Sequence, residues 1–349
     1  MKQNFIIDSD WGGDVFQLTS ILLARPKEFE ILAATVVFGN ASHDQNLVNA
    51  GALLRLLKAD DKIPVFGGHK APLGHKAPPQ GDGAHGTDGL GGVKLPLSDY
   101  TPSDQHAVDH ILETVANAPA GSITLIATGP QTNIAAAIKR DKQTMSRLKE
   151  IRIMGGCLNP ISGYRLNANW NRASEELIDR FGNITEHAEF NFQQDPASAH
   201  IVLNSGIPIT LFPMDCTHQL TFTPERQARL IQALMNAPKI EQSARGLIDA
   251  PRDMDGPKFG SASVMHDINT TISIIRPDLY PLKRGHVSIN TDAQSPEFGR
   301  TKFTPDETGH IWAAHKITDP DAAFTEVVSA LSTLYRQELQ PRQTHRHMM

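Results

Sequence analysis

Three aspartates lie close together near the start of the chain, in the stretch FIIDSDWGGDVFQL at residues 5–18. Apolar residues lead into Asp8 and Asp10, and a glycine pair separates these from Asp14. We expect a buried strand to end at the first two aspartates, whose side chains point the same way if the strand continues through both. Clustered carboxylates repel one another unless a cation or a proton neutralises them. A hard divalent cation such as Ca2+, which takes about 6–8 oxygen ligands, would resolve this repulsion.

Two other interpretations of the acidic stretch stay open at this point. Aspartates that follow a strand also cap helices and form turn hydrogen bonds, so they can serve the structure without binding a ligand. The pattern Asp-x-Asp also occurs in phosphotransferases, where an aspartate at a similar strand end is the nucleophile. The short stretch alone does not decide between these roles.

Runs of apolar residues along the chain predict strands that alternate with helices. This alternation predicts an α/β fold, with an open, mostly parallel sheet flanked by helices on both faces. Strands of such a sheet are nearly continuously apolar, as ITLIAT and IRIMGG are. The predicted strands lie within residues 4–10, 29–40, 63–68, 122–130, 150–156, 188–195 and 207–215, and the predicted helices within residues 45–60, 107–118, 131–148 and 196–206.

Glycines and polar residues follow several of the predicted strands, which end in DSD, FGN, TGP, MGG and PMD. In open parallel sheets, ligands bind beside the carboxyl ends of the strands, so we expect a ligand site at this edge. Two segments rich in glycine, proline or asparagine, residues 67–92 and 157–172, are longer than ordinary connections. Loops of such length are usually functional lids or disordered segments.

The composition excludes several classes of partner. The 349 residues carry a formal net charge of -5 with no basic face, which argues against nucleic acid as a partner. No apolar run reaches about 18 residues, so we expect no membrane span. The two cysteines, Cys157 and Cys216, are too few for a disulfide framework, and we expect a cytoplasmic protein. We expect a single domain over residues 1–338 and a polar C-terminal tail over residues 339–349.

An ordered series of short motifs follows the acidic stretch. It comprises VVFGN at 36–40, HGTDGLG at 85–91, ATGPQTN at 127–133, Met-Gly-Gly at 154–156, Glu-Phe-Asn at 189–191 and His-Asp at 266–267. Together and in this order, they resemble the calcium-dependent nucleoside hydrolases of the inosine-uridine-preferring type. The resemblance extends over residues 4 to 335. It implies a Rossmann-like nucleoside hydrolase fold and hydrolysis of the N-glycosidic bond of ribonucleosides to ribose and free base.

The resemblance also implies roles for individual residues. Asp10 matches the carboxylate that binds Ca2+ and acts as general base on a bound water. The Thr128 carbonyl and Asp267 match further calcium ligands, and His266 matches a histidine that in some relatives helps protonate the leaving base. The residues that match substrate-binding positions are Asn40, His85, Met154, Glu189 and Asn191. Relatives are expected to be homodimers or homotetramers.

The sequence departs from the family pattern at one place. Two adjacent aspartates are expected after the glycine, but the chain has Asp14 followed by Val15. In a second register, the expected pair falls on Phe16 and Gln17. Three interpretations follow. Asp14 takes the ligand role, Gln17 contributes a neutral amide oxygen, or the protein binds a ribosyl compound without hydrolysing it. The interpretation with Asp14 as ligand is favoured, because Asp10, Asp14, Asp267 and the Thr128 carbonyl are all present.

A second departure is an inserted stretch at about residues 161–186. Trp170 within it either stacks on a base or packs the loop.

Overall fold

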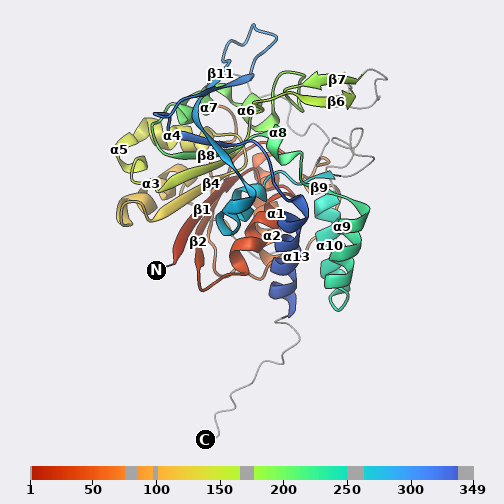
Figure 1. Ribbon diagram of the computed structural model, residues 1–349. Helices are drawn as coiled ribbons and strands as arrows, with labels where there is room; N and C mark the ends of the chain where they lie inside the picture. The colour runs from red at the N-terminus through yellow and green to blue at the C-terminus, as the bar shows by residue number, and fades with distance from the viewer. Residues whose placement is uncertain (1, 75–84, 97–100, 166–176, 250–262, 337–349) are drawn as a thin grey trace, which may run out of the picture.

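A nine-stranded sheet runs through the centre of the computed structural model, which describes residues 2–74, 85–96, 101–165, 177–249 and 263–336 (Figure 1). The strand order is β12-β11-β13-β8-β5-β4-β1-β2-β3. All neighbours are parallel except β11, which pairs antiparallel with β12 and β13. The prediction of an open, mostly parallel sheet is therefore confirmed. Its strands are β1 (Gln3–Ser9), β2 (Phe29–Val36), β3 (Val65–Gly67), β4 (Ile123–Ala127), β5 (Glu150–Met154), β8 (Ile209–Phe212), β11 (Leu282–Ile289), β12 (Thr301–Pro305) and β13 (Ile311–Ala314).

The apolar runs of the central strands are explained by burial on both faces of the sheet. In β1, Phe5 and Ile7 belong to one core cluster, and Ile6 between them belongs to a second. Successive side chains of a strand point to opposite faces, so each cluster marks one covered face.

Helices cover these two faces, as Figure 1 shows, with the α1 and α13 side on one and the α3 and α4 side on the other. The first face carries α1 (Val15–Leu23), α2 (His43–Leu56), α9 (Pro224–Ala233), α10 (Pro238–Asp249), α12 (Asn269–Ile275) and α13 (Pro320–Arg336). The second face carries α3 (Ala107–Asn117), α4 (Thr132–Arg140), α5 (Lys142–Met145) and α7 (Pro196–Leu203). The short elements α8 (Met214–Thr217) and η1 (Pro277–Leu279) connect larger ones.

The prediction of a strand within residues 188–195 is wrong. Those residues form α6 (Phe190–Gln194), because the Glu189 side chain accepts hydrogen bonds from the backbone N–H groups of Asn191 and Phe192 and so caps a helix. The inserted stretch contains the antiparallel pair β6 (Ile161–Arg165) and β7 (Leu177–Arg180), and Trp170 lies outside the described residues. A further small pair is β9 (Thr221–Phe222) with β10 (Ser263–Val264).

The parallel neighbours β1, β2, β4, β5 and β8 bring their carboxyl ends to one edge of the central sheet. Residues that follow these ends are far apart in the sequence, but the topology gathers them at this edge. Both cysteines are free and buried, and among the described residues no helix is long and apolar enough to cross a membrane. The predicted tail at 339–349 lies outside the described residues.

Candidate active site at the carboxyl ends of the strands

Asp10 stands directly after the end of β1, where its side chain is held by the backbone that follows β2. Its Oδ2 accepts a hydrogen bond of 2.8 Å from the backbone N–H of Asn40. Gly39 makes this approach possible, because a Cβ at that position would lie 2.2 Å from the same carboxylate oxygen. The aspartate is only 1% exposed. The glycine of the FGN motif therefore serves to place the Asp10 carboxylate.

Four carboxyl groups converge at this edge, namely those of Asp10, Asp14, Glu189 and Asp267, all of them buried. Burial, together with the charges of Asp14 and Glu189, raises the pKa of Asp10 to about 8, although backbone hydrogen bonds partly oppose the rise. Burial likewise holds the pKa of Asp267 well above its usual range, with Asp14, Asp10 and Glu189 adding to the effect. The neighbouring charges that raise the pKa values of Asp10 and Asp267 are thus those of other carboxylates. A folded protein keeps such a cluster of negative charge only if protons or a cation neutralise it.

The Asn191 amide hydrogen-bonds to the ends of two strands, β4 and β5, beside the carboxylates. Its Nδ2 donates to the backbone carbonyl of Met154, at 3.1 Å, and that of Thr128, at 3.4 Å. The Thr128 side chain hydrogen-bonds to Asp267, which lies just before α12. The ends of β4 and β5 and the segment before α12 thereby meet at one place.

Glu189 is held by three backbone N–H groups around its carboxylate. Its Oε1 accepts from Asn191 at 2.9 Å, and its Oε2 accepts from Gly156 at 2.8 Å and from Phe192 at 3.1 Å. These bonds lower the pKa of Glu189, but burial raises it by more, so the net shift is upward. The carboxylate thus keeps one orientation in the site.

The two histidines approach the carboxylates from other segments. His85 lies in the glycine-rich loop, and its Nε2 is 4.0 Å from Oδ2 of Asp14. His266 precedes Asp267, and its positive form would interact with Glu189 and lower the pKa of that carboxyl. The structure therefore brings all ten candidate residues to the same edge of the sheet. They are Asp10, Asp14, Asn40, His85, Thr128, Met154, Glu189, Asn191, His266 and Asp267.

The start of α1 lies where the sequence resemblance predicts two adjacent aspartates. The helix begins at Val15, and both Val15 and Phe16 are fully buried in the core cluster that contains α13. Apolar side chains supply no oxygen, so neither residue can replace a carboxylate ligand. Asp14 immediately precedes the helix and makes no side-chain capping bond, and Gln17 is also buried.

The donor set suits a hard divalent cation in kind, since it consists of buried carboxylates and a backbone carbonyl. Among the described residues, however, no three Asp, Glu, His or Cys side chains are gathered as tightly as a metal site requires. The described residues therefore offer donors of the right type, and apolar residues follow Asp14 at the start of α1.

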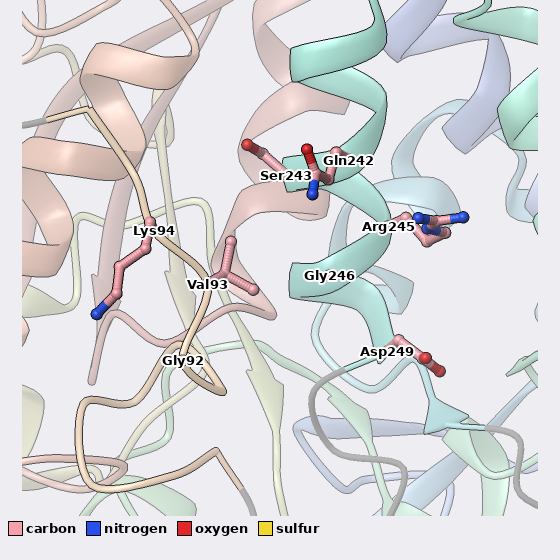
Figure 2. A pocket seen from close by; sticks show the side chains of 8 residues that line it. All are labelled: Gly92, Val93, Lys94, Gln242, Ser243, Arg245, Gly246 and Asp249. Carbon is pink, nitrogen blue, oxygen red and sulfur yellow. The ribbon is translucent and has the colours of Figure 1, made fainter.

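A pocket of about 470 Å³ lies between residues 92–94, at the end of the glycine-rich loop, and α10 (Figure 2). Gly246 allows the contact, because a Cβ there would lie 2.7 Å from the Val93 side chain. Figure 2 shows Lys94 and Arg245 pointing away from each other, so their charges do not converge on a ligand. We assign no ligand to this pocket.

The family model for inosine-uridine preferring nucleoside hydrolases matches residues 5–329. The chain belongs to this family. Among similar proteins, an uncharacterized protein of Schizosaccharomyces pombe is 34% identical over 83% of this nucleoside hydrolase and 85% of its own length. Uridine nucleosidase 1 of Arabidopsis thaliana is 32% identical over 83% and 79% of the two chains. Pyrimidine-specific ribonucleoside hydrolase RihA of Shewanella woodyi is 33% identical over 84% and 86%.

Solved structures agree with this family. The plant nucleoside hydrolase PpNRh1 superimposes with a TM-score of 0.80 at 26% identity, covering 95% of this chain and 99% of that one. The protein is therefore a nucleoside hydrolase family enzyme with the fold of those structures.

Two residues near the site are not recognisable as functional from the sequence alone. Asn133 stands in the quoted motif ATGPQTN, and its amide donates to both oxygens of Asp8. Thr217 lies 2.6 Å from the His266 ring. The motif gave a signal for the first, whereas nothing in the spacing connects Thr217 with a residue 49 positions later.

Proposed function

We propose that the protein hydrolyses the N-glycosidic bond of a ribonucleoside, giving ribose and the free base, with Ca2+ as cofactor. The observation that supports this most is the convergence of four buried carboxyl groups at the strand ends. Such clusters of perturbed carboxyl groups are typical of catalytic and cation sites. Family membership sets the reaction class.

The residues proposed to hold calcium are Asp10, Asp14, Asp267 and the Thr128 carbonyl. The first three are buried carboxylates whose charges act on one another, and Thr128 hydrogen-bonds to Asp267. When bound, calcium would supply positive charge that makes a neighbouring water more acidic.

In the proposed reaction, Asp10 acts as general base. Its carboxylate accepts a proton from a water molecule whose oxygen bonds to the anomeric carbon of the ribose. The carbon–nitrogen bond breaks through an oxocarbenium-like transition state, as in glycoside hydrolysis. The bonding electron pair leaves with the base, and His266 gives a proton to it. An imidazole suits this exchange because its ordinary pKa lies near neutrality.

The ribose side of the site is proposed to consist of Asn40, Glu189 and Asn191, with the Met154 backbone beside them and His85 over the substrate. Ribose presents several hydroxyls, and oriented carboxylate and amide groups hydrogen-bond to them. A site built to satisfy hydroxyls rejects an analogue that lacks one. We therefore propose a ribonucleoside rather than a deoxyribonucleoside as substrate.

Two of the curated relatives are named for uridine or pyrimidine ribonucleosides, so uridine is the first substrate to test. We propose that the protein forms a homodimer or homotetramer, which light scattering of the purified protein would test. We also propose a cytoplasmic location. No nucleic acid or membrane partner is proposed.

A nucleoside panel tests the proposal directly. Purified protein is expected to contain calcium and to release base from at least one ribonucleoside, and Asp10→Asn is expected to abolish release while the protein stays folded. Unchanged turnover in Asp10→Asn would refute the assigned base.

The second candidate is a protein that binds a ribosyl compound without turnover, and the burial of Val15 and Phe16 at the start of α1 favours it. Absence of calcium, together with ligand-induced thermal stabilisation and no base release, would select that candidate. Release of phosphate from a panel of phosphoesters would instead revive the phosphotransferase interpretation.

A further inference from the structure

Thr217 forms a short hydrogen bond to the histidine that the proposed function uses as proton donor. The Thr217 Oγ1 lies 2.6 Å from Nδ1 of His266, and the threonine is fully buried. Thr217 is the last residue of α8, which follows β8 at the same edge of the sheet. The contact joins residues 49 positions apart, so only the fold creates it.

The geometry around Thr217 indicates which ring nitrogen carries a proton. The Thr217 hydroxyl donates to the backbone carbonyl of Met214 at 3.2 Å. That carbonyl also accepts from the backbone N–H of His218 at 2.9 Å, which its two lone pairs allow. A hydroxyl has only one proton to give. Because the Met214 carbonyl can only accept, both contacts of the hydroxyl are hydrogen bonds only when its proton is directed to Met214. In that arrangement the oxygen of Thr217 accepts, and Nδ1 of His266 is the donor.

This arrangement fixes the ring as well as its tautomer. His218 flanks the His266 ring at a centroid distance of 5.2 Å, and both histidines are buried. Because Nδ1 is occupied by the hydrogen bond to Thr217, Nε2 is the ring nitrogen that remains for proton exchange. The choice of protonated nitrogen in a histidine is commonly set by the partner of the other nitrogen.

We propose that Thr217 is a positioning residue that keeps a proton on Nδ1 of His266 and so assigns proton exchange to Nε2. The inference rests on the proposed function, in which the doubly protonated His266 ring gives its Nε2 proton to the nitrogen of the departing base as the glycosidic bond breaks and is left neutral. Nδ1 keeps its proton, and its bond to Thr217, before and after the transfer. Thr217 itself neither touches the substrate nor exchanges a proton with it.

Three variants separate positioning from a general structural role. Thr217→Val removes the hydroxyl at nearly constant shape, and Thr217→Ser restores it. Thr271→Val is the matched control, because Thr271 is also fully buried and its hydroxyl donates to the carbonyl three residues earlier, that of Ile268, at 3.0 Å.

Each variant is assayed with uridine and with p-nitrophenyl β-D-ribofuranoside, whose leaving group departs without a proton. We expect Thr217→Val to lower kcat for uridine about 100-fold, the lower range for loss of a general acid. The nitrophenyl riboside is expected to react nearly as fast as with the wild type, with KM little changed. Thr217→Ser and Thr271→Val are expected to stay close to the wild type on both substrates. Equal losses on both substrates for Thr217→Val, or no loss on uridine, would overturn the inference.

A measurement without turnover distinguishes this inference from the proposed function. Nitrogen NMR of 15N-histidine-labelled protein, with His266 assigned by His266→Gln, is expected to show Nδ1 protonated and to lose that preference in Thr217→Val. An Nε2-protonated neutral ring in the wild type would overturn the inference even if nucleosides are hydrolysed. A wild type that shows the Nδ1 proton but hydrolyses no substrate would instead refute the proposed function.

Discussion

Asp8 and Asp10 are two residues apart at the end of β1, and their surroundings differ sharply. Asn133 donates to both oxygens of Asp8, at 3.1 and 3.0 Å, and Thr35 adds a further side-chain bond. Asp10 accepts the backbone N–H of Asn40 at 2.8 Å and the Ser9 hydroxyl at 3.5 Å, and its carboxyl group lies within reach of the charges of Asp14 and Glu189. Burial raises the pKa of Asp8 to about 7, and hydrogen bonds oppose that rise.

The difference separates a structural carboxyl group from one available for chemistry. Asn133 also donates to the Val36 carbonyl and accepts from the His69 backbone, so Asp8 belongs to a closed network that ties β1, β2 and α4 together. Asp10 sits among like charges, which a fold retains where protons or a ligand compensate them. Two aspartates of the same motif therefore differ in their surroundings, and we propose that they differ in their tasks.

Asp10→Asn should produce the largest effect. Without its general base, we expect kcat for base release to fall by about 1,000-fold or more. In EDTA, where no calcium contributes, the unfolding midpoint should stay level or rise, because a buried carboxyl group facing other carboxylates is removed. Steady-state kinetics and urea unfolding of the same preparation measure both quantities.

Asp8→Asn is the matched variant for this comparison. It should keep most of the turnover but lower the unfolding midpoint, because its amide cannot accept at two oxygens from Asn133. If both variants lose activity equally, the two aspartates do not have separate tasks.

Asn133→Ala should give the next largest effect, on stability. The change leaves the Asp8 carboxylate, the Val36 carbonyl and the His69 N–H without their amide partner. Unsatisfied buried groups cost about 1–3 kcal/mol each, so we expect a loss of roughly 3 kcal/mol in unfolding free energy. Asn204→Ala serves as control, since Asn204 is exposed and bonds only within its own helix turn. Similar losses in both variants would show that the network carries no special stability.

The sequence allowed the sheet to be predicted because its central strands are continuously apolar and the strand-end residues share a motif order. It failed at residues 188–195, where a run of strand-forming residues suggested a strand but the side-chain cap of Glu189 starts a helix. It also did not separate Asp8 from Asp10, because their difference lies in partners such as Asn133, 125 positions away. Long-range hydrogen bonds have no local signature in a single sequence.

Calcium should stabilise the protein through the Asp10 group and not through Asp8. A ligand present at 100 times its Kd raises the unfolding free energy by about 2.7 kcal/mol. We expect this gain in the wild type and Asp8→Asn, its removal by EDTA, and its loss in Asp10→Asn. Because burial raises the pKa of Asp10 to about 8, protons compete with the ion, and the gain should grow as the pH rises toward that value. Equal stabilisation of all three proteins would place the ion elsewhere.

Trp11 connects the two environments and should give the smallest effect. Its backbone has a φ of +25°, which is unusual for a bulky residue, and its fully buried indole donates to the Thr35 carbonyl at 2.9 Å. Trp11→Phe keeps the aromatic packing but removes this bond, so we expect a loss of about 1 kcal/mol in unfolding free energy. Trp312→Phe, at a partly exposed position in β13, is the control.

The turn that Trp11 stabilises carries Asp10, whereas Thr35 contacts Asp8. If the indole bond orients Asp10, Trp11→Phe should also weaken calcium-induced stabilisation. If it serves only the Asp8 network, calcium should stabilise the variant as much as the wild type. In a double-mutant cycle, Trp11→Phe and Asn133→Ala together should then lower the unfolding free energy by less than the sum of their separate effects. The cycle, together with the calcium measurement, therefore decides whether the turn at Trp11 supports Asp10, the Asp8 network, or both.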